Sequence, residues 1–258
     1  MFGRRKASSQ EERTWSAASG RAIDLSAEME QLAVSLGPLA RAQAPGYGRV
    51  LQFAAARSGE GTSTVAREFA WMAASRLGRT VWLIDADLSG PGQINAIAAH
   101  PGRYGALGGA AGASPDGSAF FAVRPQAVDA AGAPVPPARY LVAHTAGVPN
   151  LWVTRFRREQ LQPGQAAYVT PGSAYWDVMR RHAELIVIDA PGADRSQASI
   201  LLGPHVDATV LVVAADAGDS RPPALLNTAI VSGGGRMAGL FFNRAETQTL
   251  PMLRAFGA

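Results

Sequence analysis

The chain has 258 residues, 47% of them hydrophobic, which is enough to form the core of one large domain or two small ones. It has no cysteine, and its four histidines lack ligand-like spacing, which excludes a disulfide framework, thiolate catalysis and a typical zinc site. The formal net charge is +4, yet Lys6 is the only lysine, so the folded body has no lysine to bind phosphate or to form a Schiff base.

The pattern of charge and hydropathy bears on location and partners. The arginines are scattered, so we expect no nucleic-acid partner. No apolar run approaches the roughly 20 residues of a membrane span, and the basic start lacks the apolar core of a signal peptide. We therefore expect a cytoplasmic protein.

The order of predicted elements indicates an α/β domain. Residues 1–22 are polar and without periodicity, which predicts a disordered tail before a single domain over 23–258. Leu25, Met29, Leu32 and Leu36 recur at helical spacing and predict a first helix that ends near Gly37-Pro38. Five later runs are apolar without alternation, as in strands buried on both faces of a parallel sheet. These runs are Arg49–Ala56, Thr80–Asp85, Leu185–Asp189, Ala208–Ala215 and Met237–Asn243.

Helices are expected between these strands, at Ser63–Leu77, Ala174–His182, Gln197–Leu202 and Pro223–Val231. Strands that alternate with helices predict a doubly wound, mostly parallel sheet. Residues 100 to about 150 break the pattern as a Gly/Ala-rich insertion. We expect loop over Pro101–Gly117 and a small antiparallel extension at the sheet edge, made of Ala119–Val123, Arg139–His144 and Leu151–Phe156.

A glycine-rich turn, Ala56-Arg57-Ser58-Gly59-Glu60-Gly61-Thr62-Ser63-Thr64, follows the first strand and opens a helix. Such a turn aims backbone amides at an anion, and the helix N-terminus adds its positive dipole. The phosphate-loop pattern is Gly, four residues, Gly, Lys, then Ser or Thr. Ala56 replaces its first glycine and Thr62 replaces its lysine, so the turn alone is equally consistent with a plain strand-to-helix connection.

Three carboxylates follow two of the predicted strands. Asp85 and Asp87 end one strand, and Asp189 ends another. In an open α/β sheet, ligands bind beyond the carboxyl ends of the strands. With the Ser63 hydroxyl, these hard oxygens suit Mg²⁺, so we expect all four residues to share one pocket.

The sequence resembles the MinD/ParA-like phosphate-loop ATPases, and among them the bacterial tyrosine kinases of capsule and exopolysaccharide synthesis (the CpsD/CapB/Wzc type). The match rests on Ser58 to Ala66, on Leu83-Ile84-Asp85-Ala86-Asp87-Leu88, on Leu185 to Pro191 and on Gly239 to Arg244. The resemblance implies that ATP or ADP binds with Mg²⁺. The nucleotide would bind Arg57, Ser58, Gly59, Glu60, Gly61, Thr62, Ser63, Thr64 and Asn243, and the metal would bind Ser63, Asp85 and Asp189.

Two departures from the family pattern bear on activity. Thr62 stands where the family has the lysine that contacts the β- and γ-phosphates. The family's C-terminal tyrosine cluster is also missing, since Phe242 to Ala258 contains no tyrosine. We therefore expect little or no tyrosine autophosphorylation. If the protein is active, Asp85 and Asp87 are the expected catalytic residues.

Three functions stay open. The first is a kinase-like regulator of capsule or exopolysaccharide synthesis with weak or lost phosphotransfer, partnered by a membrane polysaccharide chain-length or export protein. The second is an active ATPase or tyrosine kinase in which Arg57, at the position of the family's signature lysine, replaces the missing charge. The third is a ParA/MinD-type positioning ATPase, disfavoured because Thr249 to Phe256 is too short for an amphipathic membrane helix. The resemblance leaves open a homo-oligomer and peripheral attachment to the inner membrane.

Overall fold

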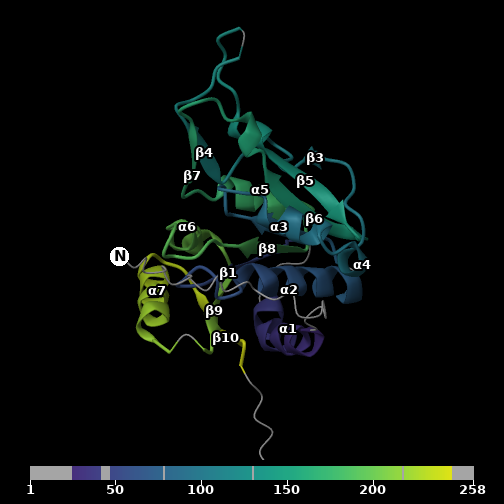
Figure 1. Ribbon diagram of the computed structural model, residues 1–258, viewed down its shortest axis with the longest axis vertical. Helices are drawn as coiled ribbons and strands as arrows, with labels where there is room; N and C mark the ends of the chain where they lie inside the picture. The colour runs from purple at the N-terminus through teal and green to yellow at the C-terminus, as the bar shows by residue number, and fades with distance from the viewer. Residues whose placement is uncertain (1–24, 42–46, 78, 130, 217, 246–258) are drawn as a thin grey trace, which may run out of the picture.

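A computed structural model describes residues 25–41, 47–77, 79–129, 131–216 and 218–245. An eight-stranded sheet, in the order β10-β9-β1-β8-β2-β6-β5-β3, forms the centre of the fold (Figure 1). The strands of this sheet are β1 (Arg49–Ala54), β2 (Val81–Asp85), β3 (Ala111–Gly112), β5 (Leu141–Ala146), β6 (Val148–Phe156), β8 (Leu185–Asp189), β9 (Ala208–Ala214) and β10 (Met237–Asn243). The helices are α1 (Ser26–Arg41), α2 (Thr62–Leu77), α3 (Gly92–Ala98), α4 (Pro101–Tyr104), α5 (Ala174–His182), α6 (Ala198–Leu202) and α7 (Arg221–Ser232).

All five predicted strands lie in this sheet, and their neighbours pair in parallel. Their side chains divide between two cores because successive residues of a strand point to opposite faces. In β8, Leu185 and Val187 pack on the face covered by α1, α2 and α3, and Ile186 and Ile188 pack on the opposite face with α5 and α6. Helix α7 covers β9 on that second face through Leu226 and Ile230. The sheet is therefore doubly wound, as predicted.

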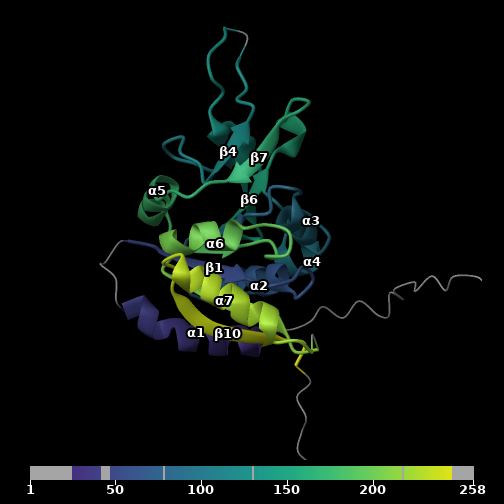
Figure 2. The ribbon, with the colours of Figure 1, turned by 90° about the vertical axis from the view of Figure 1, so that its left-hand side faces the viewer.

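The inserted region is more ordered than predicted. Strand β6 extends the parallel sheet by pairing with β2, and β5 and β3 add antiparallel strands at that edge. Strand β4 (Phe121–Arg124) leaves the main sheet and pairs with β7 (Ala166–Val169), a strand that the sequence did not predict. This two-stranded sheet lies toward the opposite end of the molecule from α1 (Figure 2), and Phe121 of β4 packs on Phe156 of β6. All three predicted runs are strands, and two of them, β5 and β6, pair in antiparallel as expected. The prediction of one three-stranded extension was wrong because β4 pairs with β7 instead.

The predicted end of the first helix was also wrong. Helix α1 continues through Gly37 to Arg41. Its buried residues Met29 and Leu36 pack in the same core as α2, and tertiary contacts of this kind override a weak local propensity to stop. Residues 1–22 and Thr249 to Phe256 lie outside the described residues. Within the described part of the chain, no helix combines the length and hydropathy needed to span a membrane.

Candidate functional site

The turn between β1 and α2 has the backbone geometry of an anion-binding loop. Gly59 and Gly61 have φ angles of +88° and +92°, which favour glycine. A Cβ on Gly61 would lie 2.0 Å from Nδ2 of Asn243, so no side chain fits there. Among the described residues, the amides of Gly59, Glu60, Gly61, Thr62 and Ser63 have no hydrogen-bond partner. Five free amides at a helix N-terminus form a site for an anion.

A cavity of about 360 Å³ opens above this loop. The ends of β1, β2 and β8 meet here, since parallel strands direct their carboxyl ends to one edge. The loop contributes most of one wall, the strand ends contribute acids, and two arginines come from elsewhere in the chain. The lining residues are Arg57, Ser58, Gly59, Gly61, Thr62, Ser63, Thr64, Asp85, Asp87, Gly92, Asp189, Ala190, Pro191, Gly192, Arg195 and Arg244. The predicted convergence of Ser63, Asp85, Asp87 and Asp189 is confirmed.

Asp85 and Asp189 form a buried carboxylate pair at the base of the cavity. They are paired neighbours on β2 and β8, and they are 3% and 4% exposed. The carboxylate of Asp85 accepts hydrogen bonds from the amides of Asp87 (3.1 Å) and Gln93 (3.0 Å). The carboxylate of Asp189 accepts a hydrogen bond from Nε2 of Gln93 (2.6 Å). Ser63 lines the same cavity as both acids.

Gln93, which the sequence did not single out, connects this pair to the loop. Its Nε2 donates to Oδ2 of Asp189 (2.6 Å) and to the carbonyl oxygen of Ser63 (2.9 Å). Its Oε1 accepts a hydrogen bond from Nη1 of Arg67 (3.1 Å). Gln93 is fully buried at the start of α3. No sequence motif predicts the role of Gln93, because its contact with the site depends on how α3 packs against the loop.

The acid pair has one oxygen that fits a metal ion. Oδ1 of Asp189 is buried and has no hydrogen-bond partner among the described residues, which is costly unless a cation or water binds it. Within the described residues, no three His, Asp or Glu side chains are close enough to form a metal site. Ser63, Asp85 and Asp189 could hold a Mg²⁺ ion only together with further oxygen ligands, which water or a phosphate would supply.

Burial changes the protonation of both acids. The pKa of Asp85 is raised to about 8, mainly by desolvation and secondly by the negative charge of the neighbouring Asp189. Desolvation also raises the pKa of Asp189 to about 6, against hydrogen bonds from Gln93 and Ser63 that lower it. Both shifts mean that two negative charges at this position are unfavourable without a bound cation.

The other predicted nucleotide-binding residues divide into two groups. Ser58 and Thr64 line the cavity. Glu60 and Asn243 do not, and they brace the loop instead: Oε2 of Glu60 accepts the amide of Arg57 (2.9 Å), and Nδ2 of Asn243 donates to the carbonyl oxygen of Glu60 (2.9 Å). The predicted contact of Asn243 with adenine stays a prediction.

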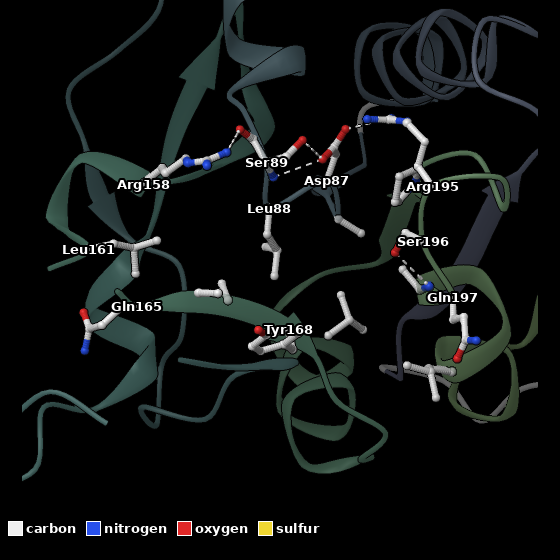
Figure 3. Close-up of a pocket in the computed structure, with 17 residues that line it drawn as sticks. Asp87, Leu88, Ser89, Arg158, Leu161, Gln165, Tyr168, Arg195, Ser196 and Gln197 are labelled. Carbon is white, nitrogen blue, oxygen red and sulfur yellow. Dashed lines mark hydrogen bonds and ion pairs between the residues drawn. The ribbon is translucent and has the colours of Figure 1, made fainter. Parts of the chain in front are cut away.

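A second cavity of about 480 Å³ adjoins the first (Figure 3). It lies between the β4–β7 sheet and the start of α6, and it includes Arg158, Leu161 and Tyr168. Asp87 and Arg195 line both cavities, so their ion pair forms part of the wall between them.

Solved structures share this architecture, although no protein-family model and no curated protein matches the chain. The kinase domain of the Escherichia coli tyrosine kinase ETK aligns with 86% of this chain and 78% of its own, with 16% identity and a TM-score of 0.52. The chimerical protein CapA2B2 aligns with 86% of both chains, with 14% identity and a TM-score of 0.57. The BceF tyrosine kinase domain aligns with 85% of this chain and 75% of its own, with 16% identity and a TM-score of 0.50.

These similarities concern the fold, because the identities are low. The chain has the fold of bacterial tyrosine kinase domains, and the predicted fold class and fold resemblance are confirmed.

Proposed function

We propose that this chain binds ADP or ATP, together with Mg²⁺, at the carboxyl ends of β1, β2 and β8. The observation that carries the proposal is the set of five unpartnered amides, Gly59 to Ser63. All of these residues except Glu60 line a cavity that is floored by two buried aspartates. Phosphate oxygens satisfy such amides, and the dipole of α2 favours their charge. The 360 Å³ cavity lies within the size range of small-ligand sites.

Bound Mg²⁺ would neutralise negative charge on the phosphates and on the carboxylates. Ser63, Asp85 and Asp189 are the residues that would hold it, directly or through water. The unpartnered Oδ1 of Asp189 and the raised pKa values of both acids support this assignment, because a cation relieves each of these costs.

We propose further that phosphotransfer is weak or lost. Thr62 is 8% exposed and offers a short neutral hydroxyl where a phosphate-loop ATPase has a long cation. No tyrosine follows Tyr175 in the sequence, so the chain has no C-terminal acceptor. A site that binds nucleotide without efficient transfer suits a regulator.

The proposed biological role is supported by the shared fold and by the sequence resemblance. Tyrosine kinase domains of this fold, and the sequence resemblance, support a regulator of capsule or exopolysaccharide synthesis or export. Its partner would be a membrane polysaccharide chain-length or export protein, which would bring the chain to the membrane periphery. Homo-oligomerisation is consistent with this role.

One observation favours a second candidate, an active ATPase or tyrosine kinase. Asp85, Asp87, Asp189 and Ser63 all line one cavity, so the acids and the hydroxyl of the family pattern are present where the lysine is missing. Asp85 and Asp87 would then act on the attacking group and the metal.

A calorimetric titration of the purified chain with ADP and ATP, with and without Mg²⁺, tests the proposal. We expect saturable binding that Mg²⁺ strengthens, and no incorporation of labelled phosphate from ATP into the protein. Absence of binding at millimolar nucleotide would contradict the proposed site. Robust autophosphorylation that Asp85→Ala abolishes would establish the second candidate instead.

A further inference from the structure

A nucleotide at this loop presents several negative charges, and the loop has no lysine to meet them. Three arginines line the cavity: Arg57, Arg195 and Arg244. Each is about half exposed, at 46%, 49% and 53% of its side chain, so each can change rotamer without breaking the core. Their present partners distinguish them.

Arg57 and Arg244 are held by acids outside the cavity. Nη2 of Arg57 lies 3.4 Å from Oδ2 of Asp219, and Nη1 of Arg244 lies 3.5 Å from Oδ2 of Asp216. Neither Asp216 nor Asp219 lines the cavity. In addition, Nη2 of Arg244 donates to the carbonyl oxygen of Gly59 (2.6 Å), so this guanidinium is bound to the loop as well. Neither Arg57 nor Arg244 pairs with an acid that lines the cavity.

Arg195 is held inside the site, between the loop and the end of β2. Its Nε donates to Oγ of Ser58 (2.6 Å), and its Nη2 donates to Oδ2 of Asp87 (2.9 Å). Figure 3 shows the guanidinium reaching across to the Asp87 carboxylate. The group therefore already lies beside the loop and an acid of the site.

The backbone fixes Arg195 in this place. Asp194 accepts hydrogen bonds from both the amide and the hydroxyl of Ser58, each at 2.9 Å. A Cβ on Gly192 would lie 2.6 Å from the Ser58 nitrogen, so the chain passes the loop closely at a glycine. The backbone from Gly192 to Arg195 is thus attached to the loop. The half-exposed side chain of Arg195 is the part of this segment that can change rotamer.

We infer that the Arg195 guanidinium binds the β- and γ-phosphates in place of the missing lysine. The inference rests on the proposed nucleotide site and names the residue that supplies its positive charge. Asp87 holds the guanidinium in the nucleotide-free protein, and the phosphates take over this role when nucleotide binds. A guanidinium suits the exchange because its planar fork binds carboxylate and phosphate with the same geometry.

Calorimetric titration with ADP and ATP, at constant Mg²⁺, tests the inference on the wild type and four variants. The variants are Arg195→Gln, Arg195→Lys, Arg57→Ala and the charge-matched control Arg79→Ala. Arg79 precedes β2, pairs with Glu184 and lies at the opposite edge of the sheet. We expect Arg195→Gln to weaken ADP binding about tenfold or more, the loss typical of a charge-assisted hydrogen bond. Arg195→Lys should recover part of the affinity, and Arg79→Ala should bind like the wild type.

A double-mutant cycle without Mg²⁺ separates phosphate binding from a structural role. Asp87→Asn should tighten ADP binding more in the wild type than in the Arg195→Gln background, because it releases the guanidinium only where one exists. Equal affinity of wild type and Arg195→Gln would overturn the inference while leaving the nucleotide site intact, and so would additive effects in the cycle. A loss confined to Arg57→Ala would transfer the role to Arg57. If the wild type itself binds no nucleotide, the proposed function fails, and the inference fails with it.

Discussion

Thr62 lines the cavity above the loop, and the sequence resemblance aligns it with the lysine of the phosphate-loop ATPases. If only this charge is missing, Thr62→Lys should strengthen ATP binding by about tenfold or more and produce measurable hydrolysis. The other side chains expected at the site, Ser63, Asp85, Asp87 and Asp189, already line the cavity. Calorimetry and a phosphate-release assay measure the two effects. Thr62→Met, similar in length to lysine but uncharged, serves as the control, and an equal response of both variants would contradict this account.

The acid pair predicts a particular dependence of stability on pH. An acid with a raised pKa in the folded state contributes stability below its ordinary pKa and loses it as pH rises through the folded value. Without Mg²⁺, the thermal midpoint should therefore fall as pH rises through about 6, for Asp189, and about 8, for Asp85. Mg²⁺ should restore it, most strongly at the upper end of this range.

Asp189→Asn tests this explanation, because it removes one of the two buried charges. We expect a higher thermal midpoint than the wild type at pH 8 without Mg²⁺, a flatter pH profile and loss of the Mg²⁺ effect. Asp116→Asn is the control, since Asp116 is an exposed acid far along the chain from the site. A wild-type midpoint that rises between pH 6 and 8 without Mg²⁺ would contradict the assignment.

At the residue scale, the sequence predicted that the acids at the strand ends lie together, but it did not predict the side chains that contact them. Asp85, Asp87 and Asp189 follow strands, and the topology of a parallel sheet brings strand ends together. Gln93 and Arg195 follow no such rule. Their positions depend on where α3 begins and on how the chain after β8 crosses the loop at Gly192, and both are products of tertiary packing.

At the element scale, an aromatic cluster joins the β4–β7 sheet to the main domain. Phe120, just before β4, is 1% exposed, and its ring centroid lies 5.3 Å from those of Phe121 and Tyr175 and 5.4 Å from that of Trp176. The last two residues belong to α5, which packs on the main sheet. The cluster makes the two sheets one packed unit.

Phe120→Ala should therefore lower the free energy of unfolding by about 3–5 kcal/mol, the usual cost of truncating a buried phenylalanine. Urea denaturation followed by circular dichroism measures the change. Phe242→Ala provides the comparison: its side chain is on β10 and is 59% exposed, so its loss should cost less than about 1 kcal/mol. Similar effects of the two substitutions would show that the cluster does not carry the junction.

Hydropathy predicted the strands that are buried on both faces of the sheet. Uninterrupted apolar runs gave the five parallel strands to within two residues at either end, and α5 was predicted with its observed bounds. Strand β7 was missed because it has only four residues, none of them fully buried, and so lacks the longer apolar run that marks the strands of the main sheet. The role of β6 was missed because its parallel partner, β2, is about 70 residues earlier in the sequence.

At the scale of the whole molecule, the fold gathers distant segments at one sheet edge. The loop after β1, the ends of β2 and β8, and the start of α3 meet there, although they span more than a hundred residues of sequence. The central claim is that this edge holds nucleotide phosphates on the amides of the loop. The free amides of the loop give this claim its chemical basis.

Amide chemical shifts of the ¹⁵N-labelled protein test this claim most directly. Saturating ADP with Mg²⁺ should shift the amide signals of Gly59 to Ser63 more than any others, because each gains a charged acceptor. Adenosine at the same concentration, which lacks phosphates, should leave them in place. Saturable ADP binding that leaves these five amide signals unmoved would contradict the account.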